Sequence, residues 1–351
     1  MKKLKHLLFI AAFMPLCSNA AEEPEWKNPA VNQQNRAERR ASFFAFENEK
    51  LATGADKTKS SRYLSLEGMW KFNFVKDYTD RPLDFFKPMF DDSKWVDFPV
   101  PGLFEIHGYG DRIYKNTSYS WYTTFKSEPP YIGETNNYTG SYRRTIEVPA
   151  DWKGSDIFMH VGSATSNLKV WINGKYVGYS EDAKIAAEFN VTKYLKPGKN
   201  LIAMQVMRWC DGSYLEDQDF WRFTGIAREA YLYARPKVHV NDITIGQDLV
   251  NGYKDGKLDV TLDIASGKKA LVDIQLVDAS GKVAVEATGI KGANNMSQSF
   301  TVSNAKAWTA ETPNLYKVVV NTGAESYAQR VGFRTSEIKN AQLLVNGQPV
   351  L

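Results

Sequence analysis

Short stretches in which large apolar and polar residues alternate recur along most of the chain. The first runs from Trp70 to Phe74, and the later ones are separated by Gly, Pro or Asn. A period of two residues places alternate side chains on opposite faces of a strand. No long stretch with a helical period lies between them. The pattern therefore predicts an all-β protein built from antiparallel sandwiches.

These stretches fall into two groups, with Arg235-Pro236 between them. In the first group, residues 63–236, Asn173-Gly174 lies between two apolar runs, which is the strongest short signal for a β-hairpin. The second group, residues 237–336, has about seven short strands, as an immunoglobulin-like sandwich does. Residues 337–351 begin a further hairpin-like stretch.

The expected strands are 140–148, 156–161, 167–171, 176–179, 201–209 and 230–234 in the first group, and 238–245, 257–264, 270–277, 298–302, 316–321 and 327–333 in the second.

Residues 1–20 have the features of a secretory signal peptide. A basic start with Lys2 and Lys3 precedes an apolar run at 7–16 that is too short to span a bilayer, and Ser18-Asn19-Ala20 offers a small-residue cleavage site. We therefore expect export to the periplasm or the extracellular space, with no membrane attachment after cleavage. Residues 21–62 form a polar N-terminal arm, within which we expect a helix over 37–45.

Composition and missing motifs exclude several functions. The formal net charge of +4 is small for 351 residues, and no Lys/Arg cluster alternates with aromatic residues, so nucleic acid is not an expected partner. The four histidines are scattered without zinc-ligand spacing. No serine-hydrolase, P-loop or dinucleotide motif is present. Together these absences argue against an independent enzyme.

The stretch from Arg208 to Arg228, RWCDGSYLEDQDFWRFTGIAR, combines carboxylates with large aromatic rings. Carboxylate oxygens accept hydrogen bonds from sugar hydroxyls, and aromatic rings pack on the apolar face of a sugar. Four acids within nine residues would be costly inside a strand if they were buried without partners. The stretch therefore predicts a binding site for sugar. Its acids are Asp211, Glu216, Asp217 and Asp219.

Two chemical alternatives remain open for these acids. Glu216 and Asp219 could form a catalytic pair, since glycoside hydrolysis uses two carboxyl groups, but a binding or loop-anchoring role is favoured. Asp211, Asp219 and Glu181 could hold a hard cation such as Na⁺, Mg²⁺ or Ca²⁺. The alternative, which the sequence favours, is that these acids pair with the neighbouring arginines, Arg208, Arg222 and Arg228.

A second polar and aromatic cluster, Ile113 to Tyr119 followed by Trp121 and Tyr122, has two interpretations of equal weight. It could line the same cleft as the acidic stretch. Its aromatic residues could instead complete the core of the sandwich.

These residues also carry a family resemblance that covers nearly all of the chain after the signal. The chain resembles the large bacterial β-galactosidases of glycoside hydrolase family 2, and Asp211 to Trp221 is the most specific part of the match. The motifs that carry the resemblance are Asn28-Pro29, Asn35-Arg36, Leu66 to Trp70, His107 to Tyr109, Ile113 to Asn116, Trp171 to Gly174, Arg208 to Trp221 and Pro313 to Tyr316.

The resemblance implies a jelly-roll sugar-binding domain over 63–236, an immunoglobulin-like sandwich over 237–336, and the start of a (β/α)₈ barrel at 337–351. In that family the acid/base and nucleophile glutamates and the active-site magnesium ligands lie in the barrel, beyond Leu351. No catalytic residue is therefore assigned in this chain, and the chain alone is expected to be inactive.

The resemblance assigns part of a galactose site to this chain. It implies that Asn116 hydrogen-bonds sugar hydroxyls, and that Asp219 contacts the sugar and helps to hold sodium. It also implies a second, structural magnesium site, in which Glu25 and Glu181 replace related polar residues. The residues of that site are Glu25, Asn28, Val31 through its carbonyl group, Glu181 and Asp211.

Two hypotheses follow. The chain is the N-terminal, non-catalytic part of an exported β-galactosidase that acts on terminal β-galactosyl units, with an arm at Asn28 to Arg36 that supports a homo-oligomer. Alternatively, it is a free-standing module that binds carbohydrate or complements a separate catalytic barrel.

Overall fold

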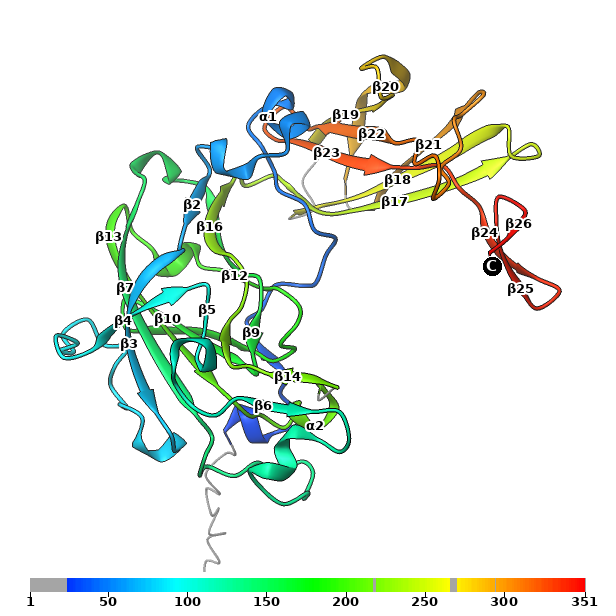
Figure 1. The fold of residues 1–351 in the computed structure, drawn as a ribbon. Coiled ribbons are helices and arrows are strands. Elements are labelled where there is room, and N and C mark those ends of the chain that lie inside the picture. The colour runs from blue at the N-terminus through cyan, green and yellow to red at the C-terminus, as the bar shows by residue number, and fades with distance from the viewer. Residues whose placement is uncertain (1–23, 217–218, 266–269, 294, 351) are drawn as a thin grey trace, which may run out of the picture.

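The computed structural model describes residues 24–216, 219–265, 270–293 and 295–350, so the predicted signal peptide lies outside the described residues. Two β-sandwiches follow each other along the chain, and a small sheet at the C-terminal end extends from the second (Figure 1). The all-β fold predicted from the sequence, a jelly-roll sandwich followed by an immunoglobulin-like one, is confirmed.

The first sandwich packs a seven-stranded sheet against a four-stranded one. In sheet order, the larger sheet contains β1 (Gln33–Gln34), β11 (Lys175–Ser180), β10 (Leu168–Ile172), β13 (Gly198–Met207), β7 (Thr139–Val148), β3 (Gly68–Val75) and β4 (Val96–Val100). The smaller contains β12 (Ala187–Asn190), β8 (Asp156–Val161), β16 (Ala230–Arg235) and β2 (Tyr63–Ser65). Two minor sheets pair β14 (Phe220–Arg222) with β6 (Ile113–Lys115), and β15 (Gly225–Ile226) with β5 (Gly102–Leu103) and β9 (Ala164–Thr165).

The predicted Asn-Gly turn joins β10 to β11. Ile172 pairs with Lys175, which leaves two residues in the turn. Asn173 and Gly174 have φ angles of 51° and 81°. Positive φ at both central residues belongs to a type I′ turn, whose twist matches that of the strands. The apolar residues on the inner faces of both sheets form one continuous core, which includes Trp70, Val170 and Leu232.

The second sandwich has a three-stranded and a four-stranded sheet with a separate core. The sheets are β17 (Val240–Val250), β18 (Asp255–Ile264) and β21 (Met296–Val302), and β20 (Val283–Gly292), β19 (Ala270–Val277), β22 (Tyr316–Asn321) and β23 (Ser326–Val331). The sequence analysis missed β20. This strand lies at a sheet edge and exposes most of its side chains, so it lacks the apolar alternation of the others.

The N-terminal arm contacts both sandwiches. It begins with a short 3-10 helix (Glu25–Lys27), adds β1 to the edge of the larger sheet, and then runs to α1 (Glu49–Gly54) beside the second sandwich (Figure 1). At Phe46 the backbone exchanges two hydrogen bonds with Ser326 of β23, at 3.0 and 2.9 Å.

The helix expected over 37–45 is wrong, because this segment is not helical in the structure. Its backbone bonds to other parts of the chain instead. The amide of Ala37 donates to the carbonyl of Glu188 at 2.8 Å, and that of Ala41 donates to Asp242 at 3.0 Å. These tertiary contacts outweigh the modest helix propensity of the segment.

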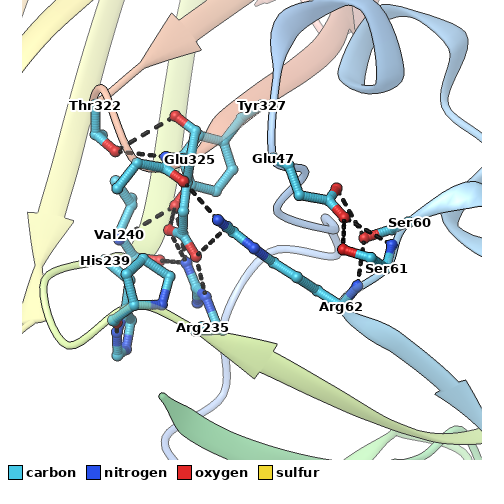
Figure 2. Close-up of polar contacts among 12 residues, drawn as sticks. Glu47, Ser60, Ser61, Arg62, Arg235, His239, Val240, Thr322, Glu325 and Tyr327 are labelled. Carbon is cyan, nitrogen blue, oxygen red and sulfur yellow. Dashed lines mark hydrogen bonds and ion pairs between the residues drawn. The ribbon is translucent and has the colours of Figure 1, made fainter. Parts of the chain in front are cut away.

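A buried ion pair joins the two sandwiches where β16 ends (Figure 2). The Arg235 Nε and Nη2 atoms donate to the two carboxylate oxygens of Glu325 at 3.0 and 2.8 Å. Arg235 also donates to the hydroxyl of Tyr327 at 2.8 Å and to the carbonyl of Val240 at 2.8 Å. From the arm, Arg62 donates to the carbonyl of Ala324 at 3.0 Å.

Residues after the second sandwich form a separate three-stranded sheet of β24 (Ser336–Lys339), β25 (Gln342–Val345) and β26 (Gln348–Pro349). Among the described residues, no helix is both long and apolar enough to cross a membrane.

Candidate functional site

The two strands β6 and β14 bring Asn116 and Asp219 together. Phe220 is the register partner of Lys115 in this antiparallel pair. Asp219 precedes Phe220 and Asn116 follows Lys115, so the two polar residues extend the pair at the same end. Both side chains are exposed. The pairing of β6 with β14 thus places Asn116 beside Asp219, as the family resemblance implied.

Aromatic rings lie beside these two residues. Tyr114 and Trp221 contact each other with ring centroids 5.4 Å apart, and each is about half exposed, at 49% and 48%. The hydroxyl of Tyr114 donates to Asp219 Oδ1 at 3.3 Å. An exposed carboxylate, an exposed amide and two half-exposed rings can together bind a sugar through its hydroxyls and its apolar face.

The second aromatic cluster divides between interior and surface. Trp121 is buried in a core with Trp26 and Trp209, which is separate from the main core of the first sandwich, whereas Tyr119 and Tyr122 remain exposed. Trp121 therefore completes a core beside the sandwich, and whether the two tyrosines line the cleft of the acidic stretch stays a prediction.

The acids of the Arg208 to Arg228 stretch separate into two places. Glu216, in the short helix α2 (Ser213–Glu216), turns inward, where its carboxylate accepts hydrogen bonds from the amide of Ala183 at 3.2 and 3.4 Å. Asp219 faces solvent and bonds to Tyr114. The structure thus gives Glu216 and Asp219 different partners. Asp217 lies outside the described residues.

A buried acidic group forms beneath α2. Glu181 and Asp211 lie close together, with Cys210, so that one ligand atom of each lies within 4.8 Å of the others. Glu181 and Asp211 are each 7% exposed. The Oδ2 atom of Asp211 is buried without a hydrogen-bond partner, which is rare in folded proteins.

Burial raises the pKa of Glu181 to about 8. The Tyr179 hydroxyl, which donates to Glu181 at 2.5 Å, opposes this rise, while the charges of Asp211 and Glu216 add to it. Burial also raises the pKa of Asp211 and of Glu216. Burial therefore disfavours the charged forms of all three carboxyl groups, and the charges of Arg222 and Lys184 partly offset this at Glu216.

Arg208 and Arg228 do not supply a compensating cation to Glu181 or Asp211. Within the described part of the chain, no ion pair joins Glu181 or Asp211 to a basic side chain. Arg208 donates to the carbonyl of Asp111 at 2.9 Å, and Arg228 donates to that of Lys184 at 2.9 Å. The pairing of Asp211 and Glu181 with arginines, which the sequence favoured, is therefore not what the structure shows.

The arm covers this acidic group. The amide of Asp211 donates to the carbonyl of Trp26 at 3.0 Å, and the amide of Glu181 donates to that of Asn32 at 3.0 Å. Asn28 and Val31, both expected as magnesium ligands, lie on the arm between these two contacts.

Two of the expected magnesium ligands already have partners. Glu25 pairs with Lys169 at 2.7 Å, and although burial opposes ionisation, this ammonium keeps the pKa of Glu25 below its ordinary value. The Oδ1 atom of Asn28 accepts from the amide of Ala30 at 3.1 Å. Of the five expected ligands, Glu181 and Asp211 are the two whose side chains the structure brings together.

Two further features were not predicted from the sequence. Glu105 is 1% exposed, accepts hydrogen bonds from the amide and hydroxyl of Thr224 at 2.8 and 2.9 Å, and has its pKa raised by burial. A cavity of about 740 Å³ lies between the arm and the smaller sheet, near Glu188 and His160. Neither has a local sequence signal, because each depends on segments that are distant in the sequence.

Comparison with known proteins identifies the class to which this arrangement belongs. Residues 63–236 match the family described as "Glycosyl hydrolases family 2, sugar binding domain", and residues 238–334 match the one described as "Glycosyl hydrolases family 2". The beta-galactosidase of Priestia megaterium is 36% identical over 345 residues, which are 93% of this chain and 33% of that protein. The beta-galactosidase of Vibrio vulnificus strain YJ016 is 35% identical over 359 residues, which are 96% of this chain and 34% of that protein.

The chain therefore belongs to glycosyl hydrolase family 2, as its motifs predicted, and corresponds to the N-terminal domains of such enzymes. It spans about a third of the length of the curated relatives it matches. The solved β-glucuronidase of an uncultured Clostridium sp. shares the fold over 82% of this chain and 47% of its own, with a TM-score of 0.62 and 23% identity. At that identity the likeness concerns the fold alone.

Proposed function

We propose that this chain is the N-terminal sugar-binding and scaffolding part of an exported β-galactosidase that hydrolyses terminal β-D-galactosyl residues. The catalytic glutamates belong to the barrel that completes such enzymes, and this chain supplies one wall of the galactose site. The placement of Asn116 and Asp219 side by side at an exposed, aromatic-lined edge carries the proposal. The similarity to beta-galactosidases supports the choice of galactose.

In this proposal Asn116 and Asp219 hydrogen-bond the hydroxyls of the terminal galactosyl unit, and Trp221 packs against its apolar face. Asp219 also offers one oxygen to a sodium ion, a hard cation that accepts carboxylate ligands. Because Asp219 is exposed, the remaining ligands come from outside the part of the chain that the structure describes or from water.

The buried acidic group fits a divalent cation. Asp211 Oδ2 has no hydrogen-bond partner, and burial raises the pKa of both Asp211 and Glu181 although each accepts a hydrogen bond, from the amide of Gly212 and the hydroxyl of Tyr179. Carboxylate oxygens are the ligands that Mg²⁺ prefers. Glu181 and Asp211 would hold the ion, with the arm at Asn28 and Val31 above them. A magnesium ion there would neutralise the buried carboxylates and fix the arm to α2, so its role is structural.

Two measurements test the galactose proposal. The purified 351-residue chain should not hydrolyse nitrophenyl-β-galactoside, because the proposal assigns the pair of catalytic carboxyl groups to the barrel. Turnover that disappears in Glu216→Gln would overturn this. Calorimetric titration with galactose and lactose should show weak binding that Asp219→Ala removes and Glu311→Ala, a change at an exposed acid of the second sandwich, does not.

A second candidate function has one observation in its favour. Leu215 of α2, shortly before Asp219 in the chain, is 86% exposed, and Tyr119 and Tyr122, shortly after Asn116, are exposed as well. If these side chains form one contiguous apolar patch, it is a surface that another protein can cover. The chain would then be a complementing module that binds a separately encoded catalytic barrel. Activity that appears on mixing the chain with such a barrel, and falls with Leu215→Asp, distinguishes this function from a sugar-binding part of one polypeptide.

We further propose that the signal at residues 1–20 directs export, and that the arm supports a homo-oligomer of the complete enzyme. Mass spectrometry of the secreted chain tests cleavage after Ala20, and light scattering with and without residues 24–36 tests the oligomer.

A further inference from the structure

A cleft of about 360 Å³ lies behind β6, next to the proposed sugar site. Its wall combines basic side chains with neutral hydrogen-bonding groups. The lining residues that matter here are Arg112, Lys115, Arg208, Asp111, Thr124 and Asn136.

The basic side chains of this cleft lack close acidic partners. Within the described ranges, Arg112 and Lys115 form no ion pair, and Arg208 reaches only Glu105, at 4.0 Å. The one carboxylate in the wall, Asp111, accepts a hydrogen bond from the hydroxyl of Tyr138 at 2.5 Å. Three basic side chains therefore line the cleft against the carboxylate of Asp111, with Glu105 behind Arg208.

Arg208 is the most informative of the three. It is 2% exposed, and its Nε atom is buried without an acceptor. A buried guanidinium is costly unless its charge is compensated and its donors are satisfied. Its Nη2 atom is held by the carbonyl of Asp111 at 2.9 Å, which fixes the side chain against the wall of the cleft. The positive charge of Arg208 is thus built into the cleft before any ligand arrives.

We propose that this cleft is an anion-binding subsite that takes a carboxylate or sulfate group. Arg112 and Lys115 contact the anion from the mouth of the cleft, and Arg208 contributes charge from its wall. The hydroxyl of Thr124 and the amide of Asn136 are further donors. Guanidinium groups and ammonium groups are the side chains that form charge-assisted hydrogen bonds with such anions.

The cleft lies beside the proposed galactose site, so its anion can be a group carried on a bound saccharide. Tyr114 lines the cleft, and its hydroxyl donates to Asp219 at 3.3 Å, so the cleft and the proposed galactose site share β6 as a wall. A sulfate or carboxylate carried on a saccharide bound at Asn116 and Asp219 therefore has a nearby place to bind. A free inorganic anion offers the same chemistry. The subsite itself does not depend on the proposed galactose site.

Calorimetric titration of the full chain with four ligands tests this proposal: sodium sulfate, sodium glucuronate, galactose and galactose 6-sulfate. Sulfate and glucuronate should bind, and less tightly as the chloride concentration rises. The variant Arg112→Met/Lys115→Met should weaken sulfate binding by at least about tenfold, since it removes two charge-assisted contacts. Lys126→Met, a nearby exposed lysine outside the cleft, is the matched control and should bind as the unmodified chain does. Circular dichroism confirms that both variants fold.

The outcomes separate the two sources of the anion. If galactose 6-sulfate binds more tightly than sulfate and than galactose, and Asp219→Ala removes only this gain, the anion arrives on a sugar. If sulfate and galactose 6-sulfate bind equally, the subsite takes a free anion. Absence of binding by every anion, or sulfate binding that the double variant leaves unchanged, overturns the subsite. Loss of galactose binding alone would count against the proposed function and not against the subsite.

Discussion

Glu325 and the pair of Glu181 and Asp211 are all buried carboxylates, but they lie in opposite electrostatic surroundings. Glu325 accepts two hydrogen bonds from Arg235 and joins the two sandwiches. Glu181 and Asp211 lie together under the arm, where no basic side chain of the described residues forms an ion pair with their carboxylates and Arg36 donates only to the carbonyl of Glu181, at 3.4 Å. A buried acid with a fixed cation is complete within the protein, whereas a buried pair of acids requires protons or a metal ion. The difference separates a structural contact from a candidate ligand site.

The largest expected effect on stability comes from breaking the ion pair between Glu325 and Arg235. Glu325→Gln removes the negative charge and leaves Arg235 buried without its counterion, so we expect the free energy of unfolding to fall by about 3–5 kcal/mol. Urea unfolding followed by tryptophan fluorescence measures the change. Glu311→Gln, at an exposed acid of the same sandwich, is the control and should have almost no effect. A loss below about 1 kcal/mol in Glu325→Gln would show that the ion pair is not needed to join the sandwiches.

Because of Glu181, which lies beside Asp211, the stability of the folded chain should depend on pH. Because burial raises the pKa of Glu181 to about 8, its folded carboxyl holds a proton that the unfolded chain has already lost. The folded state then binds more protons, and stability should fall as the pH rises from about 4.5 to 8 in metal-free buffer. The expected loss attributable to this group at pH 8 is on the order of 4 kcal/mol, since each pKa unit corresponds to about 1.4 kcal/mol.

Glu181→Gln should flatten this decline and stabilise the metal-free chain at pH 8, with little effect at pH 5. Thermal unfolding over this pH range in the presence of a chelator measures both. An unchanged pH profile in the variant would mean that Glu181 ionises normally in the folded chain.

Magnesium should supply the positive charge that the carboxylates of Glu181 and Asp211 lack. Millimolar magnesium chloride at pH 8 should stabilise the chain by about 1–3 kcal/mol, since an ion that binds only the folded state adds its binding free energy. Asp211→Asn should remove the effect, whereas Glu311→Gln, at an exposed acid, should keep it. Sodium chloride of equal ionic strength controls for screening. Equal stabilisation of both variants would show that the ion acts elsewhere.

The smallest effect on stability is expected at the exposed edge of the site. Asp219→Ala removes a carboxylate that bonds only to Tyr114 among the described residues, so the melting temperature should barely change. Galactose binding should be lost in the same variant. A marked fall in melting temperature would show that Asp219 stabilises the β6–β14 pair and would weaken its assignment to ligand binding.

The fold was predictable where the chemistry is local. The turn at Asn173-Gly174 and the strands on both sides of it follow from two residues that favour positive φ and from apolar alternation. The edge strand β20 and the arm segment at 37–45 were not predictable in this way. The first has few buried side chains, and the second is held extended by contacts with Glu188 and Asp242.

The candidate site was predictable only in part for the same reason. The family motifs placed Asn116 and Asp219 in one site, and strand pairing supports that placement. The isolation of Glu181 and Asp211 from arginines could not be read from the sequence, because Arg208 and Arg228 lie close to Asp211 in the chain but donate to carbonyl groups elsewhere. Sequence distance does not show where a long side chain points.

The course of the arm has a consequence for the order of folding. Ser42, near the start of the chain, accepts a hydrogen bond from Gln329, which lies 287 positions later. The chain is synthesised from its N-terminus. Once the first sandwich has formed, the first half of the arm can dock on it, but the second half cannot reach its native contacts until β23 has been synthesised. Contacts of such long range form late, since closing a long loop costs entropy before any contact repays it. The arm is thus among the first segments to be made and among the last to reach its final place.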